Sequence, residues 1–143
     1  MTDLAQAAVT LQQLYKADLG IDLTQMTALS RLVADACGHS TQPWQPITGF
    51  NVFAHESGIH VNAMLKDTST FEPYSPELVG GTRRYVLGKH SGRALIEDVL
   101  TRNGREFTQD DLATWLTWLR QESVSRQGEV REEELLRAFD SRS

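Results

Sequence analysis

The side chains best suited to chemistry gather between positions 51 and 92. Three of the four histidines lie there, together with carboxylates, serines and basic residues. In chain order the set is His55, Glu56, Ser57, His60, Lys66, Asp67, Arg83, Arg84, Lys89, His90 and Ser91. Imidazole changes charge closest to neutral pH, and a carboxylate that orients the ring makes the usual general base. This stretch is therefore the first candidate for an active site.

Glu56 and His60 are four residues apart, so they share one face of a helix if residues 53–66 are helical. The carboxylate would then orient the imidazole and raise its basicity, with His60 as the general base. The alternative is that His60 is a half-buried helix residue that is hydrogen-bonded for stability. Spacing alone favours this alternative without excluding the first interpretation.

Lys89, His90 and Ser91 lie just before an expected helix start. Backbone N–H groups and the helix dipole favour an anion such as phosphate or carboxylate at such a position. The alternative is a helix that Ser91 simply caps. Both interpretations place these three residues at the beginning of the same helix.

A metal site is not expected in this chain. His55 and His60 are five residues apart, which separates them by about 140° around a helix and prevents both from holding one ion. Cys37 and His39 form a single C-x-H with no second pair at metal-finger spacing. A buried cysteine near a helix end is the simpler interpretation of Cys37.

Helical periodicity and capping residues account for most of the remaining sequence. The expected helices cover residues 3–17, 22–38, 53–66, 91–104, 108–127 and 129–139. Prolines and glycines predict loops over 39–50 and 67–92, with only 84–87 suited to an extended run. Long ordered loops commonly cover functional sites. We therefore predict an all-α fold of five or six helices with one long loop that contains glycine and proline.

Composition excludes several classes of protein. The 143 residues are 40% hydrophobic and 23% charged, as in a soluble folded domain. The net charge is -5, and the basic residues are scattered, so a nucleic-acid partner is not expected. No uncharged apolar run approaches the roughly 18 residues that cross a membrane. One cysteine and no signal-peptide pattern favour a reducing, cytoplasmic setting.

Two stretches make the sequence recognisable: "NVFAHESGIHVNAMLKD" at 51–67 and "VGGTRRYVLGKHSGRA" at 79–94. They resemble the segment that follows the catalytic barrel in homocitrate, isopropylmalate and citramalate synthases. The pattern H-x-S-G-x-H, then L-K-D, then V-L-G-K-H-S-G is long and specific. Residues 18–38 are likewise similar to the first post-barrel helix of this family. The short helical tail most resembles homocitrate synthases of the nitrogen-fixation type.

The resemblance implies a domain organisation. Residues 1–19 would be a remnant of the last barrel helix, and residues 20–104 a helical lid and dimerisation subdomain. Residues 105–143 would be a C-terminal helical tail. The segment would thus lack the TIM barrel, so we expect a fragment of such an enzyme that is inactive alone and self-associates through uncovered apolar faces.

The resemblance also implies an acyltransferase reaction. Acetyl-CoA loses a methyl proton, the enolate attacks the ketone of 2-oxoglutarate, and hydrolysis of the thioester gives homocitrate and CoA. By the motif match, His60 enters the partner subunit's active site as a catalytic residue, with Glu56 and Ser57 beside it. His55 is expected to contact substrate, as are the residues of the second motif, Lys89, His90 and Ser91.

The sequence departs from the family pattern at two places. Asn62 and Ala63 stand where the family often has Asp-Gly, and Phe71 stands in place of the tyrosine of T-Y-E, so a tyrosine role does not carry over. The family binds a divalent metal through barrel residues, including H-x-H, which this chain lacks. No cofactor is therefore expected in this chain.

The expected partners are acetyl-CoA and a 2-oxo acid in the full enzyme, within a homodimer or with a barrel-bearing chain. One alternative is a natural small subunit of a split condensing enzyme of the isopropylmalate or citramalate synthase type. Another is a helical oligomerisation module without a catalytic purpose.

Overall fold

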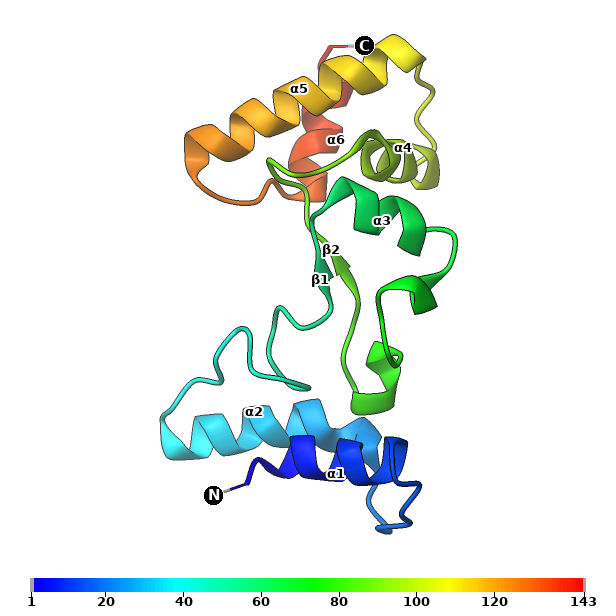
Figure 1. Ribbon diagram of the computed structural model, residues 1–143. Coiled ribbons are helices and arrows are strands. Elements are labelled where there is room, and N and C mark those ends of the chain that lie inside the picture. Colours follow the sequence, from blue (N-terminus) through cyan, green and yellow to red (C-terminus); the bar gives the residue numbers. More distant parts are fainter. Residues whose placement is uncertain (1, 143) are drawn as a thin grey trace. The chain divides into compact units, whose positions relative to one another are not determined.

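The computed structural model describes residues 2–142, which are mostly helical (Figure 1). The α-helices are α1 (Leu4–Gln13), α2 (Met26–Cys37), α3 (Gly58–Met64), α4 (Arg93–Arg102), α5 (Gln109–Arg126) and α6 (Glu132–Asp140). The 3-10 helices are η1 (Leu23–Gln25), η2 (Thr68–Thr70) and η3 (Pro76–Val79). Strands β1 (Ala54–His55) and β2 (Arg84–Tyr85) form a two-stranded sheet. The predicted all-α class is confirmed, with this short sheet as an addition.

The chain divides into two compact units that do not follow chain order. Unit 1 comprises the described residues up to Ala54 together with Glu72–Arg84. Unit 2 comprises His55–Phe71 and the described residues from Tyr85 onward. The predicted division at 19/20 and 104/105 stays a prediction.

Unit 1 packs α1 and α2 against residues from the long loop. Its core consists of Ala5, Ala8, Val9, Leu23, Met26, Phe53 and Val79. The Thr27 hydroxyl donates to the Val79 carbonyl oxygen at 2.7 Å and ties α2 to η3. Gly38 ends α2 with a φ of +67°, a left-handed conformation that glycine adopts without strain.

Several residues of unit 1 differ from expectation. Helix α1 ends at Gln13 rather than at residue 17, because Lys16 adopts a positive φ of 55°. Of the apolar residues at helical spacing in this segment, Leu4, Ala8, Leu11 and Tyr15, only Ala8 is buried and the other three are exposed. The expected burial of Cys37 is wrong, because its thiol is exposed and α2 has no buried residue after Thr27.

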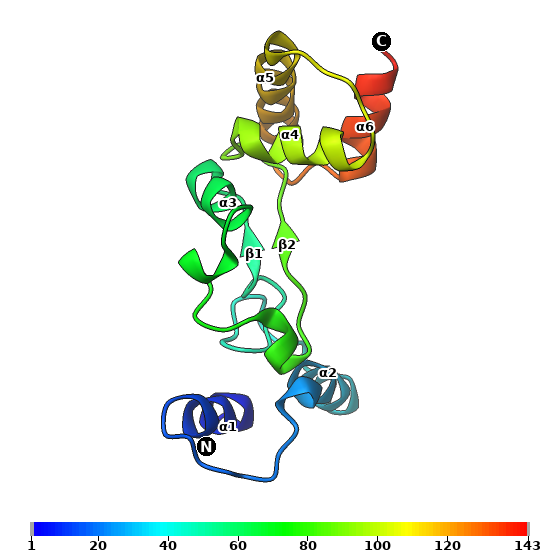
Figure 2. The same cartoon turned by 90° about the vertical axis from the view of Figure 1, so that its right-hand side faces the viewer.

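Unit 2 contains α3, α4, α5 and α6 (Figure 2). Each of these helices contributes side chains to one hydrophobic core. Its fully covered side chains include Val61, Ile96, Leu100, Leu119 and Leu135. The Val130 N–H donates to the Leu87 carbonyl oxygen at 2.8 Å, which pairs the segment after β2 with the segment before α6. This core fixes the ends of α3 and α4, where the candidate residues lie.

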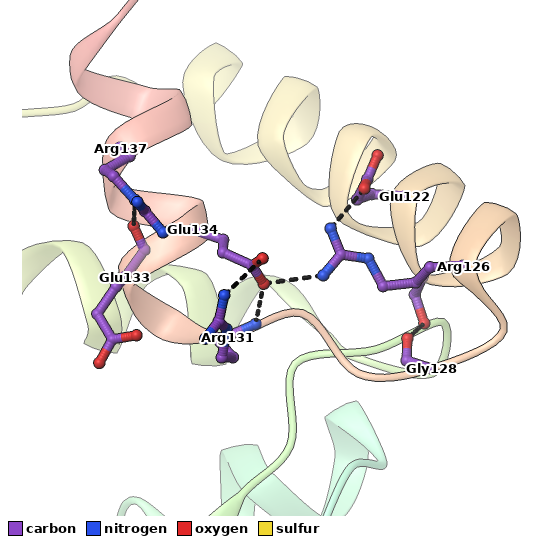
Figure 3. A network of polar contacts seen from close by, with 8 residues as sticks. Glu122, Arg126, Gly128, Arg131, Glu133, Glu134 and Arg137 are labelled. Carbon is purple, nitrogen blue, oxygen red and sulfur yellow. Dashed lines mark hydrogen bonds and ion pairs between the residues drawn. The ribbon is translucent and has the colours of Figure 1, made fainter.

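The boundaries of α5 and α6 are set by local polar contacts. Thr108 and Asp111 form a capping box at the start of α5. At its other end, the Glu134 carboxylate accepts from the guanidinium groups of Arg126 and Arg131 (Figure 3). Arg126 also binds Glu122 one turn earlier. The network joins the last turn of α5 to the first turn of α6.

Candidate functional site

His60 is presented on the surface of α3. This short helix buries Val61 and Met64, which are 0% and 2% exposed, and the adjacent His60 side chain is exposed. The imidazole stacks on the Phe71 ring, with centroids 4.1 Å apart and planes inclined by 32°. The half-buried, hydrogen-bonded histidine of the alternative interpretation is therefore not what the structure shows.

Glu56 does not lie on the same helical face as His60. The expected helix over 53–66 is shorter, because Ala54 and His55 are extended in β1 and Ser57 is the N-cap of α3. Glu56 thus precedes the helix. Its carboxylate Oε1 accepts from the backbone N–H of His90 at 3.0 Å. The expected carboxylate–imidazole pair is wrong on this geometry, and Glu56 instead holds the segment that carries His90.

Residues 56–58 and 88–92 interlock in what we call the glycine junction. The Gly58 N–H donates to the His90 carbonyl oxygen at 3.0 Å. A Cβ on Gly58 would lie 2.7 Å from the backbone N and Cα of Gly92, so neither position has room for a side chain. A Cβ on Gly88 would lie 2.4 Å from Oε1 of Glu56. The junction joins the start of α3 to the segment before α4.

Ser91 braces the second motif from inside. It is 0% exposed, and its hydroxyl donates to the Val86 carbonyl oxygen at 3.1 Å and accepts from the Gly88 N–H at 2.9 Å. Arg120 donates to the Ser91 carbonyl oxygen at 2.9 Å. The expectation that Ser91 caps α4 is wrong, because its hydroxyl is used within the loop and Gly92 is the N-cap.

The other predicted site residues differ in exposure. Lys89 and His90 reach solvent beside the α4 start, whereas Ser57 is partly buried and makes no side-chain capping bond. His55 is half-buried, with its ring centroid 6.5 Å from that of Tyr85. All of them lie in unit 2, close in sequence to the glycine junction.

The described residues offer no ligand set for a metal ion. No three His, Cys, Asp or Glu side chains from residues 2–142 come together in a suitable arrangement. The divalent metal implied by the resemblance does not fit these residues. None of the helices in the same range is long and apolar enough to span a membrane.

Comparison with known proteins identifies the family to which this segment belongs. Residues 47–127 match the family described as "Homocitrate synthase post-HMGL domain-like". The chain belongs to this family. It is 55% identical over 140 residues to 2-phosphonomethylmalate synthase of Streptomyces rubellomurinus, covering 98% of this chain and 38% of the relative. The resemblance to the post-barrel segment of these synthases is confirmed.

Two further relatives are named as a homocitrate synthase and a 2-isopropylmalate synthase. Homocitrate synthase 1 of Nostoc sp. is 40% identical over 133 residues, which cover 93% of this chain and 35% of the relative. The 2-isopropylmalate synthase 2 of Caldanaerobacter subterraneus subsp. tengcongensis is 36% identical over 137 residues, or 96% and 36%. The chain thus spans little more than a third of the length of these relatives.

Two contacts of this post-HMGL segment escaped sequence reasoning. In the sequence, Phe71 is notable only because it lacks the hydroxyl of the family's tyrosine. In the structure, its ring contacts the His60 imidazole. Glu72, 7% exposed, is bound by Arg83, whose Nε donates to Oε1 at 2.8 Å in unit 1. The spacing of neither pair matches a helical period. The only sequence signal for the contact between Glu72 and Arg83 is an acidic and a basic residue that flank a proline-containing loop.

Proposed function

We propose that this chain is the C-terminal part of a synthase that condenses acetyl-CoA with a 2-oxo acid, and that His60 is its general base. The observation that carries the proposal is the exposure of the His60 imidazole on a helix of a post-HMGL segment, with a fixed ring neighbour. An imidazole that reaches solvent can meet a substrate supplied by the rest of the enzyme.

In the proposed reaction, an imidazole nitrogen of His60 takes a proton from the methyl group of acetyl-CoA. The resulting carbanion forms a bond to the ketone carbon of the 2-oxo acid. The ketone oxygen takes up a proton from solvent and becomes a hydroxyl group, and the His60 imidazolium returns its proton to solvent. Water then cleaves the thioester and releases CoA with a free thiol. The product is a malate that carries the side chain of the oxo acid on carbon 2.

We propose that the acceptor carries a second anionic group. Homocitrate corresponds to 2-oxoglutarate, with a distal carboxylate, and is the product we expect first from the sequence. The name of the Streptomyces relative, 2-phosphonomethylmalate synthase, corresponds to an oxo acid with a phosphonate side chain. The higher identity to this relative than to the Nostoc homocitrate synthase supports testing the phosphonate acceptor beside 2-oxoglutarate.

The other motif residues support this site in the proposal. Lys89 and His90 are exposed beside the start of α4, where an anionic part of a substrate is favoured. Glu56 and Ser91 hold the segment that carries them. We further propose that the site is completed by a barrel-bearing chain, as a homodimer or as a separate subunit.

The test uses the complete enzyme and measures thiol release from acetyl-CoA with each oxo acid. His60→Ala is expected to lower kcat by about 100-fold or more, the usual contribution of a general base. His39→Ala is the matched control, because this exposed histidine lies in unit 1 and is expected to leave kcat unchanged. Full activity of His60→Ala would leave the segment only a structural role, and turnover by the 143-residue chain alone would also contradict the proposal.

A further inference from the structure

The His60 ring is held by a stacked neighbour, with no hydrogen bond to either ring nitrogen from the described residues. A general base needs a fixed ring and a reacting nitrogen that is not already occupied. A carboxylate partner fixes the imidazole ring but occupies one of its two nitrogens. A stacked phenyl ring also fixes the imidazole, and it leaves both Nδ1 and Nε2 open to a ligand.

Phe71 is itself fixed by the turn that follows α3. The N–H groups of Lys66 and Asp67 both donate to the Ala63 carbonyl oxygen, at 3.0 and 2.9 Å, so the chain leaves α3 in a tight turn. The Asp67 carboxylate then accepts from the backbone N–H of Ser69 at 2.9 Å and caps η2. The Phe71 N–H donates to Thr68 and closes η2. The backbone that carries the Phe71 ring is therefore held in place by hydrogen bonds.

The capping carboxylate is held in its charged form. The Ser69 hydroxyl donates to Asp67 at 2.8 Å, and together with the Ser69 N–H it lowers the pKa of Asp67 below its ordinary value. The Thr70 hydroxyl donates to the Asp67 carbonyl oxygen at 2.7 Å. These contacts stabilise the turn from which Phe71 approaches His60.

We propose that Phe71 is the positioning residue of His60 and performs the orienting task that sequence spacing assigns to Glu56. The contact sets the plane of the imidazole with respect to α3 and restricts its rotation about the Cβ–Cγ bond. This proposal rests on the proposed function, because an oriented ring matters for turnover only if His60 reacts with substrate.

The first measurement uses NMR on the 143-residue chain. Four histidines make assignment direct, since His60→Asn removes one set of imidazole signals. Stacking on a phenyl ring is expected to displace the His60 Hδ2 and Hε1 signals upfield. Phe71→Leu is expected to abolish this displacement, whereas Phe71→Tyr keeps the ring and the displacement. Phe50→Leu is the matched control, because Phe50 is an exposed phenylalanine of unit 1.

The second measurement uses the complete enzyme. Phe71→Leu is expected to lower kcat by about 3- to 10-fold with little change in the KM for acetyl-CoA, on the scale of one aromatic contact. Phe71→Tyr is expected to restore kcat, and Phe50→Leu to leave it unchanged. A purely structural role for Phe71 would instead lower the amount of folded enzyme without this division between kcat and KM.

Two results would overturn the proposal. Unchanged His60 signals in Phe71→Leu would show that the rings do not stack in solution. Lost displacement with an unchanged kcat would show that stacking does not position a reacting group. A full-activity His60→Ala enzyme is a different failure, because it removes the proposed function while the ring contact remains visible by NMR.

Discussion

Replacing Gly58 by alanine tests the glycine junction directly. The added Cβ would lie 2.7 Å from the backbone N and Cα of Gly92 and 3.4 Å from the carbonyl carbon of Ser91. Backbone atoms cannot rotate away as a flexible side chain does, so the two segments must separate. Overpacking of this kind costs about 1–3 kcal/mol. Weakening of the Gly58–His90 hydrogen bond adds about 0.5–1.5 kcal/mol, whereas alanine recovers at most about 1 kcal/mol of helix propensity.

We therefore expect Gly58→Ala to lower the free energy of unfolding by about 1–3 kcal/mol. Urea unfolding in a Trp44→Phe background measures this, because fluorescence then comes from Trp115 and Trp118 of unit 2. Gly128→Ala is the matched control: its nearest other atom is 3.9 Å away, and we expect a change below about 0.5 kcal/mol. Equal midpoints for the two variants would refute the close approach of the two backbones.

Three further predictions concern unit 2. The backbone N–H and guanidinium of Arg131, followed by Arg126, lower the pKa of Glu134 from 4.5 to about 2. The ionised Glu134 carboxylate therefore stabilises the fold above pH 4.5, and this stabilisation is lost as the pH falls toward 2. The urea midpoint of Glu134→Gln should therefore fall less between pH 4.5 and pH 2 than that of the unchanged protein. Thr108→Ala removes the side-chain cap of α5 and should cost about 1 kcal/mol in urea unfolding, whereas the exposed Thr114→Ala should not. Leu119→Ala, at a 0% exposed position, should cost about 2–5 kcal/mol when unfolding is followed by far-UV circular dichroism.

The helices of unit 2 follow from the sequence because their signals are local. Thr108 and Asp111 mark the start of α5 within one turn, and the carboxylates of the first turn mark α6. Helix α3 is shorter than its periodicity predicts for the opposite reason. The His55 carbonyl oxygen accepts from the Val86 N–H at 2.9 Å, so a partner some thirty residues later draws the expected first turn into a strand.

The candidate site shows the same division. The sequence motif singles out His60, but spacing assigns it the wrong neighbour. Glu56 binds a backbone N–H that is 34 residues away, and Phe71 reaches the imidazole from the next turn. Such contacts depend on the path of the loops in the folded chain. The spacing of hydrophobic residues in the sequence does not predict this path.

The discontinuous makeup of unit 1 has a consequence for synthesis on the ribosome. The hydrogen bond between Thr27 and Val79 spans 52 residues, and at about 5–20 residues per second Val79 is added roughly 3–10 s after Thr27. During this interval Leu23 and Met26 have no complete core to enter, so nascent chains present apolar surface to chaperones and to one another. Synonymous codons that slow translation between residues 27 and 79 are expected to reduce the yield of folded chain more than slow codons placed after residue 84.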